Sequence, residues 1–138
     1  LKNAKREEVR SLAQTIIDAQ SKEIKQMKAW YTDWFGRALP SGEQVMNQHN
    51  MMGSTNNQSM HMGMMGDESD LTRLENTTDF DKAFIEEMIP HHQMAVMMAQ
   101  MLKNTTSREE MKKLADDIIT TQTKEIDQMK AWQKDWGY

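Results

Sequence analysis

The chain contains 138 residues with a formal net charge of −4, and its 21 acidic and 17 basic residues are interspersed along the sequence. Interspersed charges are typical of solvated helix faces, so a nucleic-acid-binding surface and a polybasic membrane anchor are excluded. No apolar run reaches the roughly 18 residues that a membrane-spanning helix needs. Cysteine is absent, which excludes disulfides and thiolate chemistry, whereas methionine is unusually frequent at 15 residues.

The first predicted element is one copy of an internal repeat. Residues 6–36 align without gaps to residues 108–138, and 18 of the 31 aligned positions are identical. Apolar residues recur in both copies with the helical period. We therefore expect amphipathic helices over 4–35 and 107–136, the second repeating 5–34.

The ends of both repeat helices carry recognisable signals. Gly36 and Gly137 suit the C-terminal ends, and Ser107 with Glu110 forms a candidate capping box at the start of the second helix. Tryptophans recur four residues apart near both C-terminal ends, where we expect core and bundle-end packing: Trp30, Trp34, Trp132 and Trp136.

A methionine-rich linker is predicted between the repeats, over residues 37–77. It has too few large apolar residues at a regular spacing to form a core element, so we expect it to be largely irregular. Nine candidate copper ligands are concentrated in it: Met46, His49, Met51, Met52, Met60, His61, Met62, Met64 and Met65. The thioether sulfur is a soft ligand that binds Cu(I) and Ag(I) but has little attraction for Mg²⁺, Ca²⁺ or Zn²⁺. A hydrophobic contact surface, an oxidation sink and a linker without a role stay open as alternatives.

Another helix is predicted over residues 78–102, where Thr78 and Asp79 can cap its start. Pro90 lies inside this helix and is expected to kink it. One face is expected to form the core, with His92 at its edge: Phe80, Phe84, Met88, His91, Ala95, Met98, Ala99 and Leu102. A different arc, which in a bundle normally presents polar residues to water, carries three methionines: Met94, Met97 and Met101.

Two histidines on this helix and a carboxylate on the last helix form a second candidate site. Adjacent residues diverge by about 100° on a helix, so we expect one of His91 and His92 to face the core and the other the bundle edge. Gln122 and Glu125 lie within the apolar arc of the last helix, and a buried carboxylate needs a partner. We expect Glu125 to contact His91 or His92, either as a structural hydrogen bond or as a contact that orients an imidazole for metal binding.

These residues favour a copper-binding protein that is not an enzyme. Cu(I), with Ag(I) as a mimic, is expected to bind thioethers and imidazoles, and Cu(II) at histidine is a secondary mode. The ligand candidates on the histidine-bearing helix are Met88, His91, His92, Met94, Met97, Met98 and Met101. A di-iron oxidase is disfavoured because its Glu-x-x-His motif is missing: Met88 and Ile89 stand three residues before the histidines. The alternative hypothesis is a Met-rich helical module that docks a partner protein or a second copy without metal.

Fourteen positions match the pattern of a known family: Phe84, Met88, Ile89, His91, His92, Ala95, Met98, Ala99, Ala115, Gln122, Glu125, Ile126, Met129 and Trp132. On these residues the chain resembles bacterial extracytoplasmic proteins of the domain-of-unknown-function family 305. The resemblance covers residues 78–136 closely, and residues 6–34 match the second half of the same pattern.

The helix pattern predicts an all-α, antiparallel helical bundle of one domain over residues 1–138, and the resemblance implies that this bundle is ferritin-like. It also implies a periplasmic or otherwise extracytoplasmic location and a role in copper resistance or trafficking. Because the chain begins at Leu1 without a signal peptide, we expect that segment to lie upstream. Candidate partners are copper ions, a copper efflux or sensor protein, and a second copy that completes the bundle. The histidine pair belongs to the family pattern, whereas the methionines at 94, 97, 101 and in the linker are additions.

Overall fold

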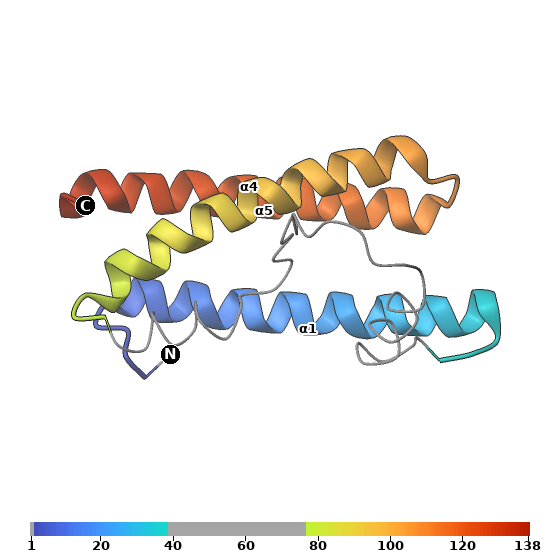
Figure 1. Cartoon of the computed structure of the whole chain (residues 1–138), viewed down its shortest axis with the longest axis horizontal. Coiled ribbons are helices and arrows are strands. Elements are labelled where there is room, and N and C mark those ends of the chain that lie inside the picture. The colour runs from blue at the N-terminus through green and yellow to red at the C-terminus, as the bar shows by residue number, and fades with distance from the viewer. Residues whose placement is uncertain (1, 39–76) are drawn as a thin grey trace, which may run out of the picture. The chain divides into compact units, whose positions relative to one another are not determined.

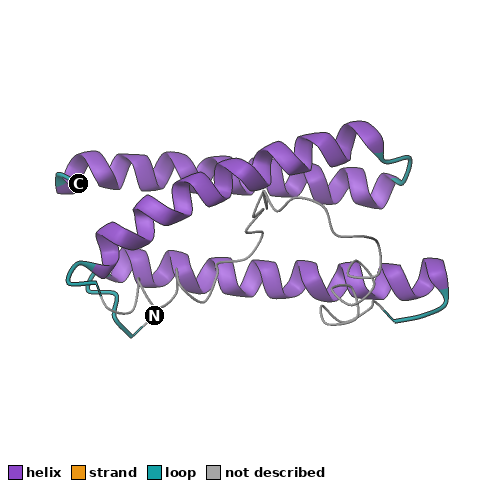
Figure 2. Cartoon of the chain, viewed as in Figure 1, coloured by secondary structure: helices purple, strands orange, loops and turns teal. Residues whose placement is uncertain are grey.

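The computed structural model describes residues 2–38 and 77–138, which form three helices and contain no strand (Figures 1 and 2). The helices are α1 (Glu7–Phe35), α4 (Phe80–Thr105) and α5 (Glu109–Trp136). The predicted all-α class with three long helices is confirmed. The described residues divide into two compact units, one containing α1 and the other containing Lys2–Arg6, α4 and α5. The single domain over residues 1–138 stays a prediction.

Helix α1 begins at Glu7, where the sequence predicted residue 4, and ends at Phe35 as predicted. Glu7 and Glu8 place negative charge in the first turn, where the helix dipole favours it. Gly36 ends the helix with a φ of 65°, and its N–H donates to the carbonyl of Thr32 at 2.8 Å. This left-handed conformation is readily adopted only by glycine, which explains the sharp stop.

The residues ahead of α1 belong to the second unit, where the carboxylate of Asp81 holds them. Oδ1 of Asp81 accepts the backbone N–H of Lys5 at 3.0 Å, and Oδ2 accepts that of Arg6 at 2.8 Å. Nζ of Lys5 donates to the carbonyl oxygen of Thr78 at 3.1 Å. Asp81 is only 1% exposed, so these backbone N–H groups replace the hydrogen bonds that its carboxylate would otherwise make with water. Nothing in the sequence distinguished Asp81 from an ordinary acidic residue in a first helical turn.

Replacement of Asp81 by asparagine is expected to destabilise the fold by about 1–3 kcal/mol, the cost of leaving a buried hydrogen-bonding group without a partner. The amide keeps one acceptor, but its NH₂ group faces a second backbone N–H. Urea unfolding followed by circular dichroism measures the change. The control is Asp117→Asn, because Asp117 makes only an exposed ion pair with Lys113 at 2.7 Å. Equal unfolding midpoints for the two variants would contradict the assigned role of Asp81.

Helices α4 and α5 form an antiparallel hairpin with residues 106–108 as its connection (Figure 1). Asp79 caps α4 as predicted, accepting the backbone N–H of Lys82 at 3.4 Å. Helix α4 continues through Pro90 to Thr105, beyond the predicted end at residue 102. The predicted capping box at the start of α5 was wrong, because Arg108 occupies the N-cap position and the helix begins at Glu109. Gly137 ends α5 with a φ of 73°, as predicted.

The buried side of α4 differs from the predicted core face. Ile85, Ile89, His92 and Ala99 follow one another at spacings of four, three and seven residues, and all four are buried. Of the predicted core face only Phe84 and Ala99 are buried, whereas its methionines and His91 are half-buried. The predicted face left out the two isoleucines. Burying a large aliphatic side chain stabilises the fold by about 1.5–3 kcal/mol, so α4 is oriented with both isoleucines inside the hairpin.

On α5 the buried residues are aliphatic except for Glu125, which the sequence placed within an apolar arc. They are Leu114, Ala115, Glu125, Ile126 and Met129. Met129 is completely buried, and Ile126 is 7% exposed. The hairpin interior is therefore aliphatic with one carboxylate and one imidazole inside it.

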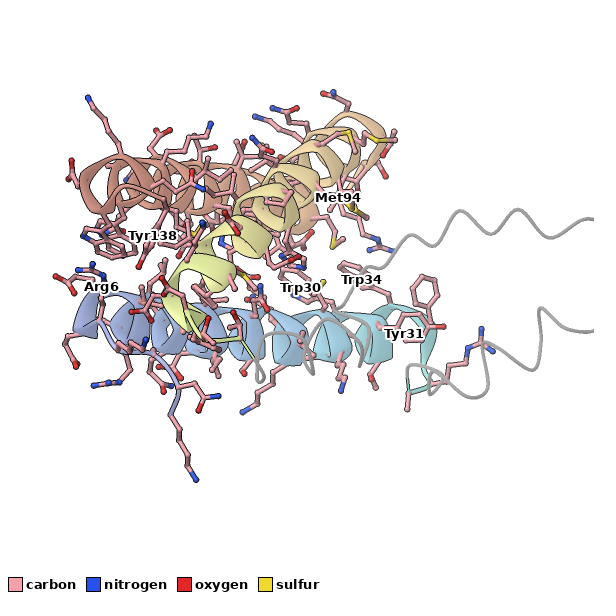
Figure 3. The ribbon with its side chains drawn as sticks, turned by 60° about the vertical axis from the view of Figure 1, so that its left-hand side comes forward. Arg6, Trp30, Tyr31, Trp34, Met94 and Tyr138 are labelled. Carbon is pink, nitrogen blue, oxygen red and sulfur yellow. The ribbon has the colours of Figure 1, made fainter. Side chains whose placement is uncertain are left out.

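The end of the hairpin unit is closed by aromatic contacts (Figure 3). Trp132 and Trp136 stack with ring centroids 5.2 Å apart, and Tyr138 packs edge-on against Trp136 at 5.8 Å. The guanidinium carbon of Arg6 lies 4.1 Å from the Trp136 ring centroid, a cation–π contact. In α1 the repeated pair Trp30 and Trp34 stacks in the same way at 5.8 Å. All four tryptophans are half-buried, so they contribute end packing and not the core.

Candidate metal site

Three exposed methionines form a stripe along α4, and we call Met94, Met97 and Met101 the methionine stripe. Their exposed fractions are 42%, 51% and 62%, whereas the buried side of the same helix is formed by Ile85, Ile89 and His92. Residues three or four apart on a helix have Cβ atoms about 5–6 Å apart, so consecutive members are neighbours. Figure 3 shows the Met94 side chain extending from α4. The predicted exposure of these three residues is confirmed.

An exposed methionine is unfavourable in free energy, because its apolar surface stays in water and is not offset by burial in the core. The side chain is apolar and flexible, and at these positions it contacts water where a lysine or glutamate is normal. What the stripe offers to solvent is three uncharged sulfur atoms on a rigid helix. Such a set can share one soft ion between adjacent sulfurs and can hold no hard ion such as Mg²⁺ or Ca²⁺.

A second arrangement lies inside the hairpin, where His92 and Glu125 form a buried pair. Nε2 of His92 lies 2.8 Å from Oε2 of Glu125, and the residues are 0% and 9% exposed. The predicted contact between Glu125 and one of the histidines is confirmed. Because a carboxylate only accepts, Nε2 carries a proton and donates, so a neutral His92 has its lone pair on Nδ1. That Nδ1 atom is buried and has no hydrogen-bond partner among the described residues.

The neighbouring His91 is half-buried, which corrects the sequence prediction that placed His91 on the core face and His92 at its edge. Burial, and then the nearby His92, lower the pKa of the His91 imidazole below its ordinary value. The ring is therefore neutral at neutral pH and carries a lone pair. Its Nδ1 is buried without a hydrogen-bond partner in the part of the chain that the structure describes. The two rings have centroids 6.0 Å apart and are tilted by 57°.

The remaining candidates on the hairpin are half-buried. Met88 and Met98 lie on α4 one or two turns from the histidine pair, and Gln122 lies one turn before Glu125 on α5. The Oε1 atom of Gln122 is buried and lacks a hydrogen-bond partner among the described residues. Buried polar atoms without a hydrogen-bond partner are candidates for binding a further donor or ion.

The candidates of the predicted linker lie outside the described residues: Met46, His49, Met51, Met52, Met60, His61, Met62, Met64 and Met65. Within residues 2–38 and 77–138, no three histidine, aspartate or glutamate side chains are grouped closely enough to hold a metal ion together. Across those same residues, no helix is long and apolar enough to cross a membrane.

Comparison with known proteins matches a family and several solved structures. The profile of a family described as a domain of unknown function, DUF305, matches residues 1–133. CopM in the Cu(II)-bound form superposes with a TM-score of 0.79 at 46% identity, covering 99% of this chain and 82% of that chain. CopM in the Cu(I)-bound form gives 0.75 at 43%, covering 99% and 81%. CopM in an Ag-bound form obtained by soaking gives 0.75 at 42%, covering 99% and 79%.

A curated relative is an uncharacterised protein of Acanthamoeba polyphaga mimivirus. It is 45% identical over 49 residues, which make up 36% of this chain and 32% of the viral protein. The match thus spans about a third of the length of that relative. It adds no ligand and no reaction to those that the residues themselves suggest.

Proposed function

We propose that this chain, which belongs to the DUF305 family, binds Cu(I), with Ag(I) as its mimic, through methionine thioethers and histidine imidazoles. The observation that carries the proposal is the methionine stripe, because three thioethers that are 42% to 62% exposed on one ordered helix offer soft ligands to solvent and lie outside the buried core. The copper-bound and silver-bound forms of CopM, similar over 99% of this chain, support the choice of metal.

The stripe supplies the ordered part of the proposed site. Met97 and Met101 are four residues apart on α4, so their sulfur atoms can reach one ion, and Met94 is three residues from Met97. Cu(I) accepts two or three ligands, so no preformed cage is needed. The seven methionines and two histidines between residues 46 and 65 are proposed as further ligands on sequence grounds alone.

The histidine pair is proposed as a second, weaker mode that suits Cu(II). Nδ1 of His92 is held in place by the contact between Nε2 and Glu125, the arrangement in which a carboxylate orients a metal-binding imidazole. Its neighbours in this mode are His91, Met88 and Met98, with the Gln122 amide beside them. A Cu(II) ion can reach Nδ1 of His92 only when the hairpin opens locally, because His92 is completely buried.

The proposed biological role is capture of copper for sequestration, resistance or transfer in the cell envelope. A copper efflux or sensor protein is the proposed recipient. The competing hypothesis is a docking module in which the methionine stripe and other exposed apolar residues of the described chain, such as Ile17 and Phe35, bind a partner or a second copy. Sedimentation with and without Cu(I) separates the two, because docking through apolar surface does not depend on the metal.

Titration of the apo protein with Cu(I) against a competing chelator tests the proposal. We expect binding that is tighter than the competitor and that weakens when the stripe and linker methionines are replaced by leucine. Iron and Mg²⁺ are titrated in the same way as control ions and are expected not to bind. Binding that is absent, or that is unchanged in the leucine variant, overturns the proposal.

Thioether binding predicts a weak dependence on pH. A thioether carries no proton that a metal ion must displace, whereas an imidazole must be neutral to bind. Lowering the pH from 7 to 5 is therefore expected to change the Cu(I) affinity of the methionine sites by less than about threefold. A variant with His49, His61 and His91 replaced by glutamine, which keeps the buried contact between His92 and Glu125, reports chiefly on those sites in the competition titration. A proton-linked loss of tenfold or more in that variant contradicts thioether ligation.

A further inference from the structure

We propose that the methionine stripe is also a site of reversible sulfoxidation by two-electron oxidants of the peroxide class, and that this modification releases the metal. The inference rests on the proposed function, because the state that is switched is the metal-binding state. It concerns Met94, Met97 and Met101 and assigns them a chemistry that a passive ligand does not need.

Exposure singles out these three methionines within the hairpin unit. Sulfur is oxidised by direct contact with the oxidant, so the rate follows access. The stripe residues are 42% to 62% exposed, whereas Met129 is 0% exposed and Met88, Met98 and Met111 are half-buried. Within one folded unit the chain thus offers reactive thioethers beside a protected internal reference.

The chemical step balances with hydrogen peroxide as the oxidant. A lone pair on the thioether sulfur attacks one peroxide oxygen and the O–O bond breaks. The proton on the oxygen now bound to sulfur is transferred to the departing hydroxide, which leaves as water. Sulfur loses two electrons and gains an S–O bond, and the peroxide is reduced by two electrons. Methionine sulfoxide reductases return the thioether in a two-electron reduction, in which a dithiol reductant is oxidised to a disulfide and the oxygen leaves as water.

The product has a different preference for metals. Oxidation uses one of the two sulfur lone pairs for the S–O bond, leaves the sulfur electron-poor and therefore a weaker ligand for a soft ion, and gives a polar sulfoxide whose accessible donor is oxygen, a harder atom. Cu(I) and Ag(I) are therefore expected to leave the stripe. The reverse also holds: a bound metal ion withdraws electron density from the sulfur and shields it, so metal binding is expected to slow oxidation.

The fold tolerates the change at the stripe but not at the core. A sulfoxide at an exposed position of α4 is hydrated by solvent, so the helix keeps its buried contacts through Ile85, Ile89 and His92. At Met129 the same oxygen enters the largely aliphatic interior, where it has lost its hydration, which is costly. Reversibility without unfolding is thus restricted to the exposed residues.

The test begins with the full-length apo protein treated briefly with hydrogen peroxide and analysed by peptide mass spectrometry. We expect Met94, Met97 and Met101 to form sulfoxide at least roughly tenfold faster than Met129. Ag(I) is used as the bound metal because, unlike copper, it does not generate radicals from peroxide. Bound Ag(I) is expected to slow sulfoxide formation at the stripe, also by roughly tenfold. Methionine sulfoxide reductases of both stereospecificities should then restore the thioethers.

Metal binding is measured in a variant whose seven linker methionines are leucine, so that the signal reports the helices. In that background, oxidation is expected to weaken Ag(I) binding roughly tenfold or more, and reductase treatment is expected to restore it. The matched control adds Met94→Leu, Met97→Leu and Met101→Leu and should show no oxidation-dependent change. Circular dichroism confirms that each variant is folded.

Two results overturn the inference: oxidation of the stripe no faster than that of Met129, or full Ag(I) affinity after the stripe is oxidised. In the first case the unoxidised protein still binds the metal and the proposed function stands. In the second case the protein still binds the metal, but the metal is bound by donors other than the stripe sulfurs. If the unoxidised wild-type protein binds neither Cu(I) nor Ag(I), the proposed function fails and the metal switch fails with it.

Discussion

Replacement of Met94, Met97 and Met101 together by leucine removes the ordered soft-metal site and is expected to weaken Cu(I) binding at α4 by at least tenfold, on the order of the loss of a thioether pair. Leucine matches methionine in size and apolarity, and these positions are exposed. The unfolding free energy should therefore change by less than about 0.5 kcal/mol. The measurement is a chelator competition in the variant lacking linker methionines, with urea unfolding in parallel.

The matched control for this variant is Met27→Leu. Met27 is 38% exposed on α1, and the described part of that helix contains no second methionine at a helical spacing. It has the same chemistry and similar access, but it has no neighbouring thioether with which to share an ion. Equal losses of affinity in the control and the stripe variant would show that the stripe has no special role, and unchanged binding in both would remove α4 from the site.

The second large effect, a loss of stability, is expected at the buried pair of His92 and Glu125. Glu125→Ala leaves His92 inside the hairpin without its partner, and breaking one side of a buried pair costs about 3–5 kcal/mol. Glu125→Gln keeps one acceptor within reach of Nε2 and is expected to cost less. Urea unfolding followed by circular dichroism measures both, with the exposed Glu110→Ala as a control that should leave the midpoint unchanged.

The glutamine variant also distinguishes the two roles left open for Glu125. If the carboxylate orients His92 for a metal, the change weakens Cu(II) binding by about 10–100-fold. If it is a structural hydrogen bond, Cu(II) binding stays the same and only stability falls. Spectroscopic titration with Cu(II) on protein shown to be folded gives the answer.

The fold was largely readable from the sequence because the repeat and the helical period agree with each other. The helix ends were less accurate: α5 begins at Glu109 because Arg108, and not Ser107, occupies the N-cap position. The core face of α4 was placed too far toward Met88 and His91. In a helix rich in methionine, the spacing of apolar residues is compatible with several core faces. Only the packed hairpin shows that Ile85 and Ile89 are the buried residues.

The candidate site was predictable where it depends on local helical geometry and on the cost of burial. The exposure of the stripe follows from its phase on α4, and the contact between Glu125 and His92 follows from the cost of an unpaired carboxylate in an apolar arc. Which histidine would pair was not predictable, because the two differ only by the rotation of α4. Asp81 was missed for a related reason, since its partners are backbone N–H groups 75 and 76 residues away in the chain.

The most direct test of the account is an anomalous-scattering map from crystals of the full chain soaked with Ag(I). We expect silver peaks bonded to sulfur atoms of the methionine stripe, with at least one ion shared by Met97 and Met101. Silver found only at imidazole nitrogens, or no silver at any sulfur of α4, would contradict the claim that exposed thioethers of this helix bind the metal.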